Sequence, residues 1–363
     1  MSDSAGPGAG FEYPSVPVSW LKRDVLLFAN SIGCKADELH FLYVRSHLLR
    51  HFFFFFFFTA SSSPNAVTAR CPIKLAFQST QLTSYTQELH PSFKAFPTYP
   101  IILPFKHTDQ EVIDFYARAS STPIPGVPKF DSKRGVDGER KITFLKPLPP
   151  TSEGKKFEIR SKVIGVYDKG KAGSVVETQQ ELVEVGSEEV YSRVRGSGFM
   201  VGQGNWGGPK GPKVPSYNPP TNKKPDATYT LQTSPETALL YRLNGDYNPL
   251  HADPEPGKQM GFGGCIIHGL FSWNSTAAGI LHELGGSDPA NMKEFQARFA
   301  SPVKPGDTLV TEMWRTGEHV DVGGEKWEDV RFATRVEGGK VCLSNGRCLM
   351  RCVGGKGGGQ SKL

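Results

Sequence analysis

The 363-residue chain lacks the features that mark several large classes of protein. Its six cysteines form no C-x-x-C pair, so the spacing typical of zinc sites and dithiol redox centres is missing. No apolar run approaches the roughly 20 residues of a membrane-spanning helix, and the N-terminus lacks the apolar core of a secretory signal. We therefore expect neither a metal site, nor a membrane span, nor a secreted disulfide framework.

The charged residues also lack the clustering that is typical of nucleic-acid-binding proteins. The net charge is only +6, and Lys and Arg are spread along the chain apart from a small group near Lys223. A moderate basic excess suits an anionic small ligand better than a nucleic acid. We therefore expect no nucleic-acid partner.

One segment, residues 44–87, has the pattern of neither a helix nor a strand. It contains seven consecutive phenylalanines, which would promote aggregation if they were exposed. Codons for Val44 and Gln87 can carry the ends of an intron, the Phe run can be encoded by a pyrimidine tract, and Leu82-Thr83 can encode a branch point. We predict a retained in-frame intron or a gene-model error, the alternative being a genuine low-complexity insertion loop.

The rest of the sequence divides into two halves with a common order of elements. In each half an early helical region precedes an apolar-Pro corner and a set of long strands. This order predicts an α+β protein with a tandem (double) hot-dog fold, in which a long helix is wrapped by curved antiparallel sheet in each half. The alternative is a pair of unrelated α+β domains. The expected parts are a disordered lead (1–16), a first half (17–201, with the insert 44–87), a Gly/Pro-rich linker (202–225), a catalytic second half (226–353) and a flexible tail (354–363).

The expected elements follow from hydrophobic periodicity and from Gly and Pro at their ends. The expected helices are 19–34, 109–119, one starting at Ser234, and 268–284. The expected strands are 140–147, 156–167, 173–185, 189–201, 227–232, 294–301, 307–316, 327–337 and 340–352.

The densest group of polar residues lies at residues 241–270. Asp246, Asn248 and His251 stand within six residues around a proline that ends the preceding helix and fixes an extended turn. Such side chains can converge on one water molecule, and Asp with His supplies general acid/base chemistry near neutral pH. Gly269 opens an apolar helix, whose first N–H groups lack intrahelical acceptors and can donate to an oxyanion.

Each residue of this group also has a simpler interpretation. Asp246 alone could cap a turn, and His251 alone could be a surface histidine. We expect His268 to brace the loop, and Asp253, which precedes Pro254, to start the next helix. The group as a whole favours catalysis.

The pattern Y-R-L-x-x-D-x-N-P-L-H-x-D-P, followed by G-F and H-G-L, resembles the motif of the hydratase 2 family. That family includes MaoC-like dehydratases and the hydratase unit of the peroxisomal multifunctional enzyme. The resemblance covers most of the chain outside residues 44–87. It implies a hydro-lyase that converts trans-2-enoyl-CoA to (3R)-3-hydroxyacyl-CoA and back. It also implies one active site, no cofactor beyond the coenzyme A of the substrate, and a first half that receives a bulky acyl chain.

The same resemblance assigns roles to individual residues. Asp246 and His251 match the catalytic pair, Asn248 belongs to the same hydrated group, and Gly269 matches the donor to the thioester oxygen. At position 137 this chain has Asp where the family has His. Four residues match positions that contact the acyl group or coenzyme A: Asp137, Gly138, Lys169 and Phe299.

The chain ends in Ser361-Lys362-Leu363, a tripeptide that the peroxisomal import receptor reads, on a glycine-rich tail that would expose it. We therefore expect a peroxisomal enzyme of fatty-acid β-oxidation. Three alternatives stay open: an acyl-CoA thioesterase, a peroxisomal dehydratase of secondary metabolism, and a non-catalytic acyl-CoA-binding protein. The sequence also leaves open the acyl-chain preference, a homodimeric state, and which of Asp246 and His251 is the base.

Overall fold

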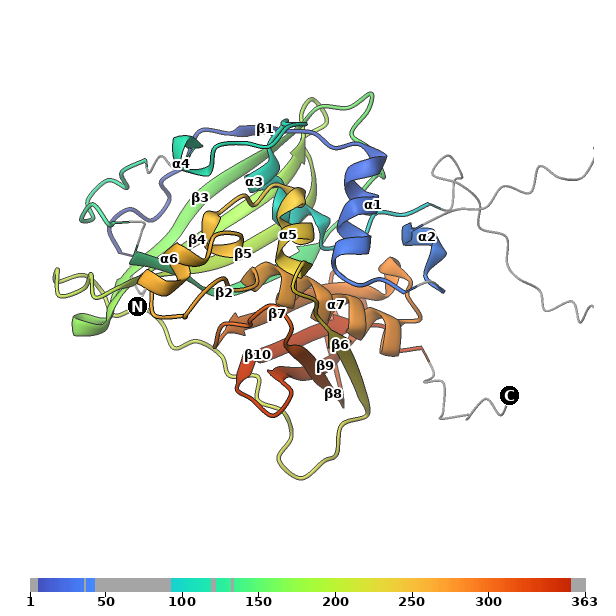
Figure 1. The fold of residues 1–363 in the computed structure, drawn as a ribbon. Coiled ribbons are helices and arrows are strands. Elements are labelled where there is room, and N and C mark those ends of the chain that lie inside the picture. The colour runs from blue at the N-terminus through green and yellow to red at the C-terminus, as the bar shows by residue number, and fades with distance from the viewer. Residues whose placement is uncertain (1–5, 36, 43–92, 119–121, 132–133, 354–363) are drawn as a thin grey trace, which may run out of the picture.

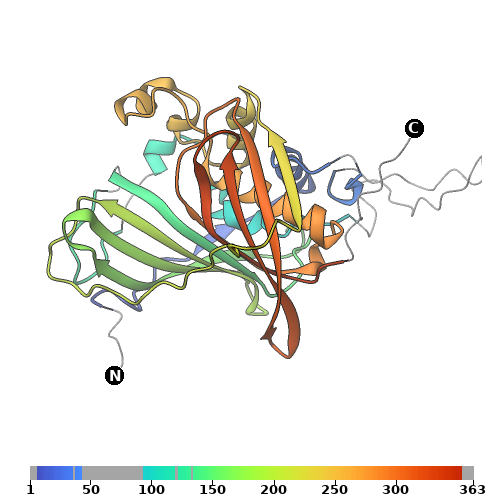
Figure 2. The ribbon, with the colours of Figure 1, turned by 90° about the horizontal axis from the view of Figure 1, so that it is seen from below.

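The computed structural model describes residues 6–35, 37–42, 93–118, 122–131 and 134–353. The segment 44–87 and the C-terminal tripeptide 361–363 lie outside these ranges. The described residues form a ten-stranded antiparallel sheet of order β1-β3-β4-β5-β2-β7-β10-β9-β8-β6. The first five strands of this order come from the first half of the chain and the last five from the second half. Figures 1 and 2 show two curved parts of one sheet, with β2–β5 green in the first half and β7–β10 orange to red in the second.

Nine of the ten strands lie close to where the sequence pattern places them, while β1, which starts at the end of the expected disordered lead 1–16, was not predicted. Long runs rich in β-branched and aromatic residues, bounded by Gly-containing turns, fix their positions locally. The first half contributes β1 (Val16–Val18), β2 (Gly135–Phe144), β3 (Phe157–Asp168), β4 (Gly173–Glu184) and β5 (Glu189–Val201). The second half contributes β6 (Ala227–Gln232), β7 (Met292–Phe299), β8 (Thr308–Val322), β9 (Glu325–Val336) and β10 (Val341–Met350).

The second half wraps its sheet around one long helix. This helix, α7 (Gly269–Gly285), has 17 residues, nearly all of them buried. Its Trp273 packs edge to face on Phe295 of β7, with ring centroids 4.5 Å apart. A helix that is apolar on every side must be buried in a core, and the expected helix 268–284 is confirmed. Among the described residues, no helix is long and apolar enough to cross a membrane.

The first half differs from the expectation of a long helix. Its longest described helix is α1 (Lys22–Ser31), with ten residues. The expected helix 109–119 is reduced to one turn, α4 (Phe115–Arg118), because Val112 and Tyr116 are 63% and 61% exposed and leave no apolar stripe to hold a longer helix on the sheet. The prediction of a long helix is therefore wrong for the described part of the first half, while the double hot-dog architecture holds.

The two halves join through β2 and β7. These strands pair antiparallel from Glu139 opposite Arg298 to Thr143 opposite Glu294. The pairing places the start of β2, near Asp137, beside the end of β7. The carbonyl of Arg140 in β2 also accepts a hydrogen bond from Trp273 Nε1 of α7 at 3.3 Å. One continuous sheet therefore connects the first half to the helix of the second.

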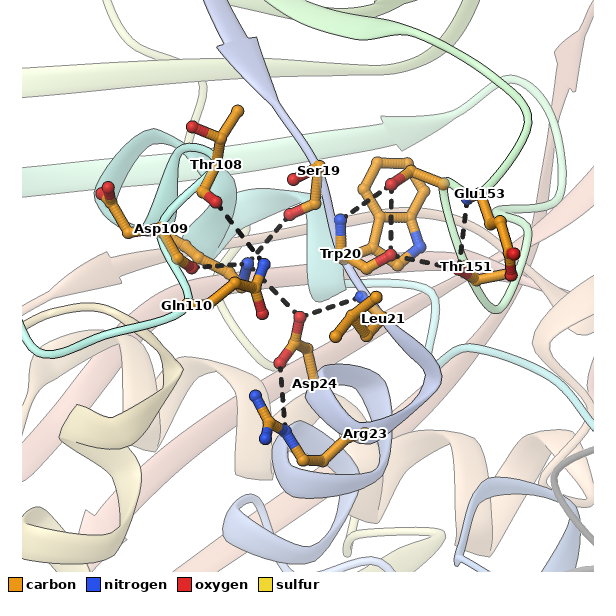
Figure 3. A network of polar contacts seen from close by, with 12 residues as sticks. Ser19, Trp20, Leu21, Arg23, Asp24, Thr108, Asp109, Gln110, Thr151 and Glu153 are labelled. Atoms are coloured by element: carbon orange, nitrogen blue, oxygen red, sulfur yellow. Dashed lines mark hydrogen bonds and ion pairs between the residues drawn. The ribbon is translucent and has the colours of Figure 1, made fainter.

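A buried ion pair orders the helices of the first half. Lys106 ends α3 (Leu103–Lys106), and its Nζ lies 3.3 Å from Asp24 Oδ2 of α1, with both residues at most 9% exposed. Lys106 Nζ also donates to the carbonyls of Ser19 and Asp109, and Asp24 accepts the N–H of Leu21 at 2.9 Å. Figure 3 shows Ser19, Leu21, Asp24 and Asp109 converging on this point. A buried charge needs such partners, so the network fixes α1 against α3.

Candidate active site

Residues 246–251, here called the polar bend, lie against the end of α3. Helix α5 (Thr237–Tyr241) continues into a 3-10 turn that stops at Gly245, where φ is 120°. A Cβ at Gly245 would lie 2.8 Å from the Cα of Lys106, so only glycine fits there. The bend that carries Asp246 is thus seated directly on the residue that forms the buried ion pair.

Asp246 is held by backbone groups. Its Oδ1 accepts the N–H of Asn248 at 3.3 Å, and its carbonyl accepts a hydrogen bond from His268 Nε2 at 3.1 Å. Burial raises the pKa of the Asp246 carboxyl to about 6; the N–H of Asn248 opposes this shift, and the charge of Asp137 adds to it. A carboxyl with such a pKa can both hold and release a proton near neutral pH.

Asn248 shapes the turn on which His251 lies. Its Oδ1 accepts the N–H of Leu250 at 3.1 Å and so caps the 3-10 helix η5 (Pro249–His251). The next helix, α6 (Pro254–Gln259), begins as expected, with Asp253 Oδ1 accepting the N–H of Glu255. Both caps fix the chain around the histidine.

His251 is buried as a neutral base. Its Nδ1–H donates to the carbonyl of Ile266 at 2.8 Å, which leaves the lone pair of Nε2 free. Burial lowers the pKa of His251 to about 4, so the ring is uncharged at neutral pH. The ring stacks on His268, with centroids 3.6 Å apart. His268 therefore supports both His251 and the backbone of Asp246.

Asp246, His251 and His268 each offer a ligand atom, and these atoms lie within 4.8 Å of one another. Metal ions bind imidazole nitrogen along the lone pair, which lies in the ring plane. The two rings are tilted by only 25°, so their lone pairs lie in nearly parallel planes instead of meeting at one point. The arrangement favours a hydrogen-bonded water over a chelated cation.

These groups face a cavity of about 600 Å³ on the inner side of the sheet, here called the inner cavity. Gly269 opens α7 at its wall, next to Phe299: a Cβ at Gly269 would lie 3.1 Å from the Phe299 ring. The first N–H groups of α7 have no acceptor within the helix and suit a developing negative charge. The rest of the wall is mainly apolar and includes Phe105, Phe115, Met200, Met260, Phe262, Leu270 and Leu343.

Asp137 also reaches the inner cavity, together with a residue that sequence reasoning missed. Its Oδ1 pairs with Arg140 Nη2 at 2.8 Å, and both residues line the wall. The signal that could have found Arg140 was an acidic and a basic residue three positions apart at the start of a strand leading to the site. The pair gives this apolar cavity one charged edge.

A second cavity of about 610 Å³, here called the outer cavity, lies across the sheet. It shares Val136, Asp137 and Phe299 with the inner cavity, so the two meet at these residues. Gly138 and Lys169 line the outer cavity, away from the polar bend. The Nζ of Lys169 donates to the Lys210 carbonyl and lies 5.4 Å from the ring centroid of Tyr167.

The structure thus separates the predicted residues into two groups. Asp246, Asn248, His251 and Gly269 surround one point of the inner cavity, while Gly138 and Lys169 belong to the outer cavity. Asp137 and Phe299 stand where the cavities meet. Such a site can add or remove water beside a polarised carbonyl, which is the chemistry of a hot-dog hydro-lyase.

Comparisons with known proteins give the particular family. The profile described as "MFE-2 hydratase 2 N-terminal domain" matches residues 76–202, and "MaoC like domain" matches residues 216–337. The chain belongs to the MaoC-like hydratase 2 family and is a hydro-lyase. The first match begins inside the segment 44–87.

Several relatives carry names that fit this assignment. The chain is 46% identical to the "Probable dehydratase NIT22" of Ajellomyces capsulatus, over 94% of this chain and 81% of that protein. It is 34% identical to the "Probable enoyl-CoA hydratase 2" of Dictyostelium discoideum, over 81% of each. The "Enoyl-CoA hydratase 2, peroxisomal" of Arabidopsis thaliana is 36% identical over 54% of this chain and 65% of that protein.

A solved structure agrees. The crystal structure of a MaoC-like dehydratase from Phytophthora capsici is similar over 95% of this chain and 97% of that one, with a TM-score of 0.69 and 30% identity.

Proposed function

We propose that this enzyme hydrates trans-2-enoyl-CoA to (3R)-3-hydroxyacyl-CoA and catalyses the reverse dehydration. The observation that carries the proposal is the pairing of a neutral His251 with a carboxyl of raised pKa, Asp246, on the wall of the inner cavity beside Gly269. The (3R) configuration rests on the family resemblance.

The catalytic steps follow from the protonation states. The Gly269 N–H, aided by the α7 dipole, stabilises negative charge on the thioester oxygen and makes the β-carbon electrophilic. The free Nε2 of His251 takes a proton from water as its oxygen bonds to the β-carbon. The protonated Asp246 gives a proton to the α-carbon. His251 then holds the proton that it took from water, and transfer of this proton to the deprotonated Asp246 restores the enzyme.

The two cavities suit the two ends of the substrate. The mainly apolar inner cavity of about 600 Å³ is of a size typical for ligand pockets and suits the acyl chain. Gly138 and Lys169 in the outer cavity suit the coenzyme A arm, as the resemblance implies. The thioester then lies where the cavities meet, near Asp137 and Phe299. In this scheme the enzyme needs no metal or redox cofactor, because every proton has a protein donor or acceptor.

The physiological direction and location form part of the proposal. We propose a peroxisomal enzyme of fatty-acid β-oxidation, supported by the tripeptide Ser361-Lys362-Leu363 and by the peroxisomal name of the Arabidopsis relative. The name of the Ajellomyces relative favours, as a second candidate, a dehydratase acting on a 3-hydroxyacyl thioester. A fluorescent fusion at the N-terminus should be punctate, and removal of the three residues should leave it cytosolic.

The decisive experiment uses purified protein and enoyl-CoA esters of several chain lengths. Hydration removes the conjugated enoyl thioester, and chiral separation of the products should give the (3R) alcohol. Release of free thiol would instead support a thioesterase. Binding without turnover would support a non-catalytic acyl-CoA-binding protein. Turnover restricted to a polyketide-like 3-hydroxyacyl thioester would support secondary metabolism.

A further inference from the structure

The linker between the halves crosses the outer cavity. Residues 212–217 contain no helix or strand, and five of these six residues line that cavity. The opposite wall is formed by residues of β2, β3, β4, β5 and β7, including Lys141 and Arg298. The linker therefore forms a wall of a cavity whose far side is the sheet.

One aromatic residue anchors this wall. The ring of Tyr217 lies against two guanidinium groups, with its centroid 4.7 Å from Arg331 and 4.9 Å from Arg347. The N–H of Tyr217 donates to Asn345 Oδ1 at 2.6 Å, and Asn345 Nδ2 donates to the carbonyl of Pro215 at 3.2 Å. Ring and backbone are thus fixed together.

The anchoring arginines are themselves held rigidly. The carboxylate of Asp329, 2% exposed, pairs with Arg331 at 2.5 Å and with Arg347 at 2.7 Å. Arg347 also pairs with Glu294 at 3.2 Å. Buried, multiply bonded charges resist displacement. The position of residues 212–217 is therefore set by the second half of the sheet.

The outer cavity is suited to an anion. Five basic and three acidic side chains line it. Lys213 lies on the linker, is exposed, and forms no ion pair with any residue that the structure describes. Lys141 and Arg298, by contrast, pair with Glu294 and Glu139. Lys213 is thus, with Lys169 and Arg195, one of three cations of this cavity that form no ion pair with a described residue and have charge available for a ligand.

We propose that residues 212–217 form the outer wall of the channel for the phosphate-bearing arm of coenzyme A. Tyr217 is the positioning residue that holds this wall, and Lys213 binds a phosphate of the arm. This inference rests on the proposed function, since it takes an acyl-CoA as substrate. Because the cavities meet at Asp137 and Phe299, an acyl chain in the inner cavity places the arm in the outer one.

The test compares two thioesters of one acyl group: the coenzyme A ester, and the N-acetylcysteamine ester, which lacks phosphates. Tyr217→Ala should raise KM for the coenzyme A ester about tenfold, because the wall must be ordered on binding, and should leave kcat unchanged. The N-acetylcysteamine ester should show no change. Tyr217→Phe keeps the ring against both arginines and should behave as wild type.

Lys213→Ala should raise KM for the coenzyme A ester about threefold, with the loss shrinking at high salt, as for an exposed charge pair. Lys340→Ala, on an exposed turn outside both cavities, is the matched control. Calorimetric titration with coenzyme A alone should show weaker binding to both Tyr217→Ala and Lys213→Ala. An unchanged coenzyme A affinity, or equal losses with both esters, would overturn the inference. Failure of the wild type to hydrate any enoyl thioester would instead refute the proposed function.

Discussion

In the proposed mechanism, the burial of Asp246 serves catalysis at the expense of stability. Its pKa of about 6, against an ordinary value of 3.8, means that the folded state holds a proton that the unfolded chain releases between these pH values. The folded protein therefore loses stability as the pH rises through this window. The same shift keeps an acid available for the α-carbon.

Asp246→Asn should separate these two effects. The amide keeps an oxygen for the Asn248 N–H but cannot transfer a proton, so hydration should fall by about 10²–10⁴-fold. At pH 7.5 the variant should be more stable than wild type by about 1–3 kcal/mol, and near pH 4 the two should agree. Denaturant unfolding at both pH values, with steady-state kinetics, measures this. Near-normal turnover would remove Asp246 from the mechanism.

Asp137 should tune the same acid. Asp137→Asn removes a negative charge that raises the pKa of Asp246, so the loss of kcat/KM at high pH should begin at lower pH than in wild type. Glu139→Gln, on the outer side of β2, is the matched control and should leave the profile in place. A pH profile of kcat/KM measures this effect. If the decrease at high pH begins at the same pH in Asp137→Asn as in wild type, the electrostatic role is contradicted.

At the scale of elements, the position of the polar bend, residues 246–251, depends on helices of the first half. Gly245 packs on the backbone of Lys106, and Lys106 is fixed by the buried Asp24. The bend is therefore positioned by α1 and α3, which lie more than a hundred residues earlier in the chain.

Lys106→Met should test this dependence. It leaves the Asp24 carboxylate buried without its cation, which costs about 3–5 kcal/mol of unfolding free energy. The Lys94–Asp288 pair provides a control, since both side chains are 45% exposed, and Lys94→Met should cost at most about 1 kcal/mol. Chemical denaturation compares the two. Equal losses would show that the buried pair does not hold the bend in place.

At the scale of the whole molecule, one continuous sheet makes two halves into one enzyme. The first half supplies Asp137 and Gly138, the second supplies the acid/base pair, and β2–β7 pairing brings them together. Residues of both halves line the inner cavity, among them Met200 from the first half and Leu270 from the second. An acyl chain can therefore lie across both halves.

The origin of the segment 44–87 as a retained intron is also a prediction at the scale of the whole molecule. If it is an unspliced intron, the mature transcript should join the codon of Tyr43 to that of Glu88, and a protein lacking 44–87 should be active and less prone to aggregate. Sequencing the spliced message measures the first outcome, and light scattering on the two proteins measures the second. A spliced message that still encodes the phenylalanine run would refute the hypothesis.

The sequence by itself determined nine of the ten strands, the helix α7, the position of Asp246, Asn248 and His251 on one bend, and the family. These depend on periods of two and 3.6 residues, on proline and glycine, and on spacings of a few residues, all of which are local. The four residues of the bend and helix start did come together at one cavity.

Only the tertiary structure decided the rest. The pKa of Asp246 and His251 depends on burial, which is created by elements from both halves. The stacking of His268 on His251 and the anchor of Tyr217 on Arg331 and Arg347 join residues that no short-range pattern links. The shortened helix of the first half was decided the same way, since a helix of modest apolar content forms only where the sheet offers it a face to cover.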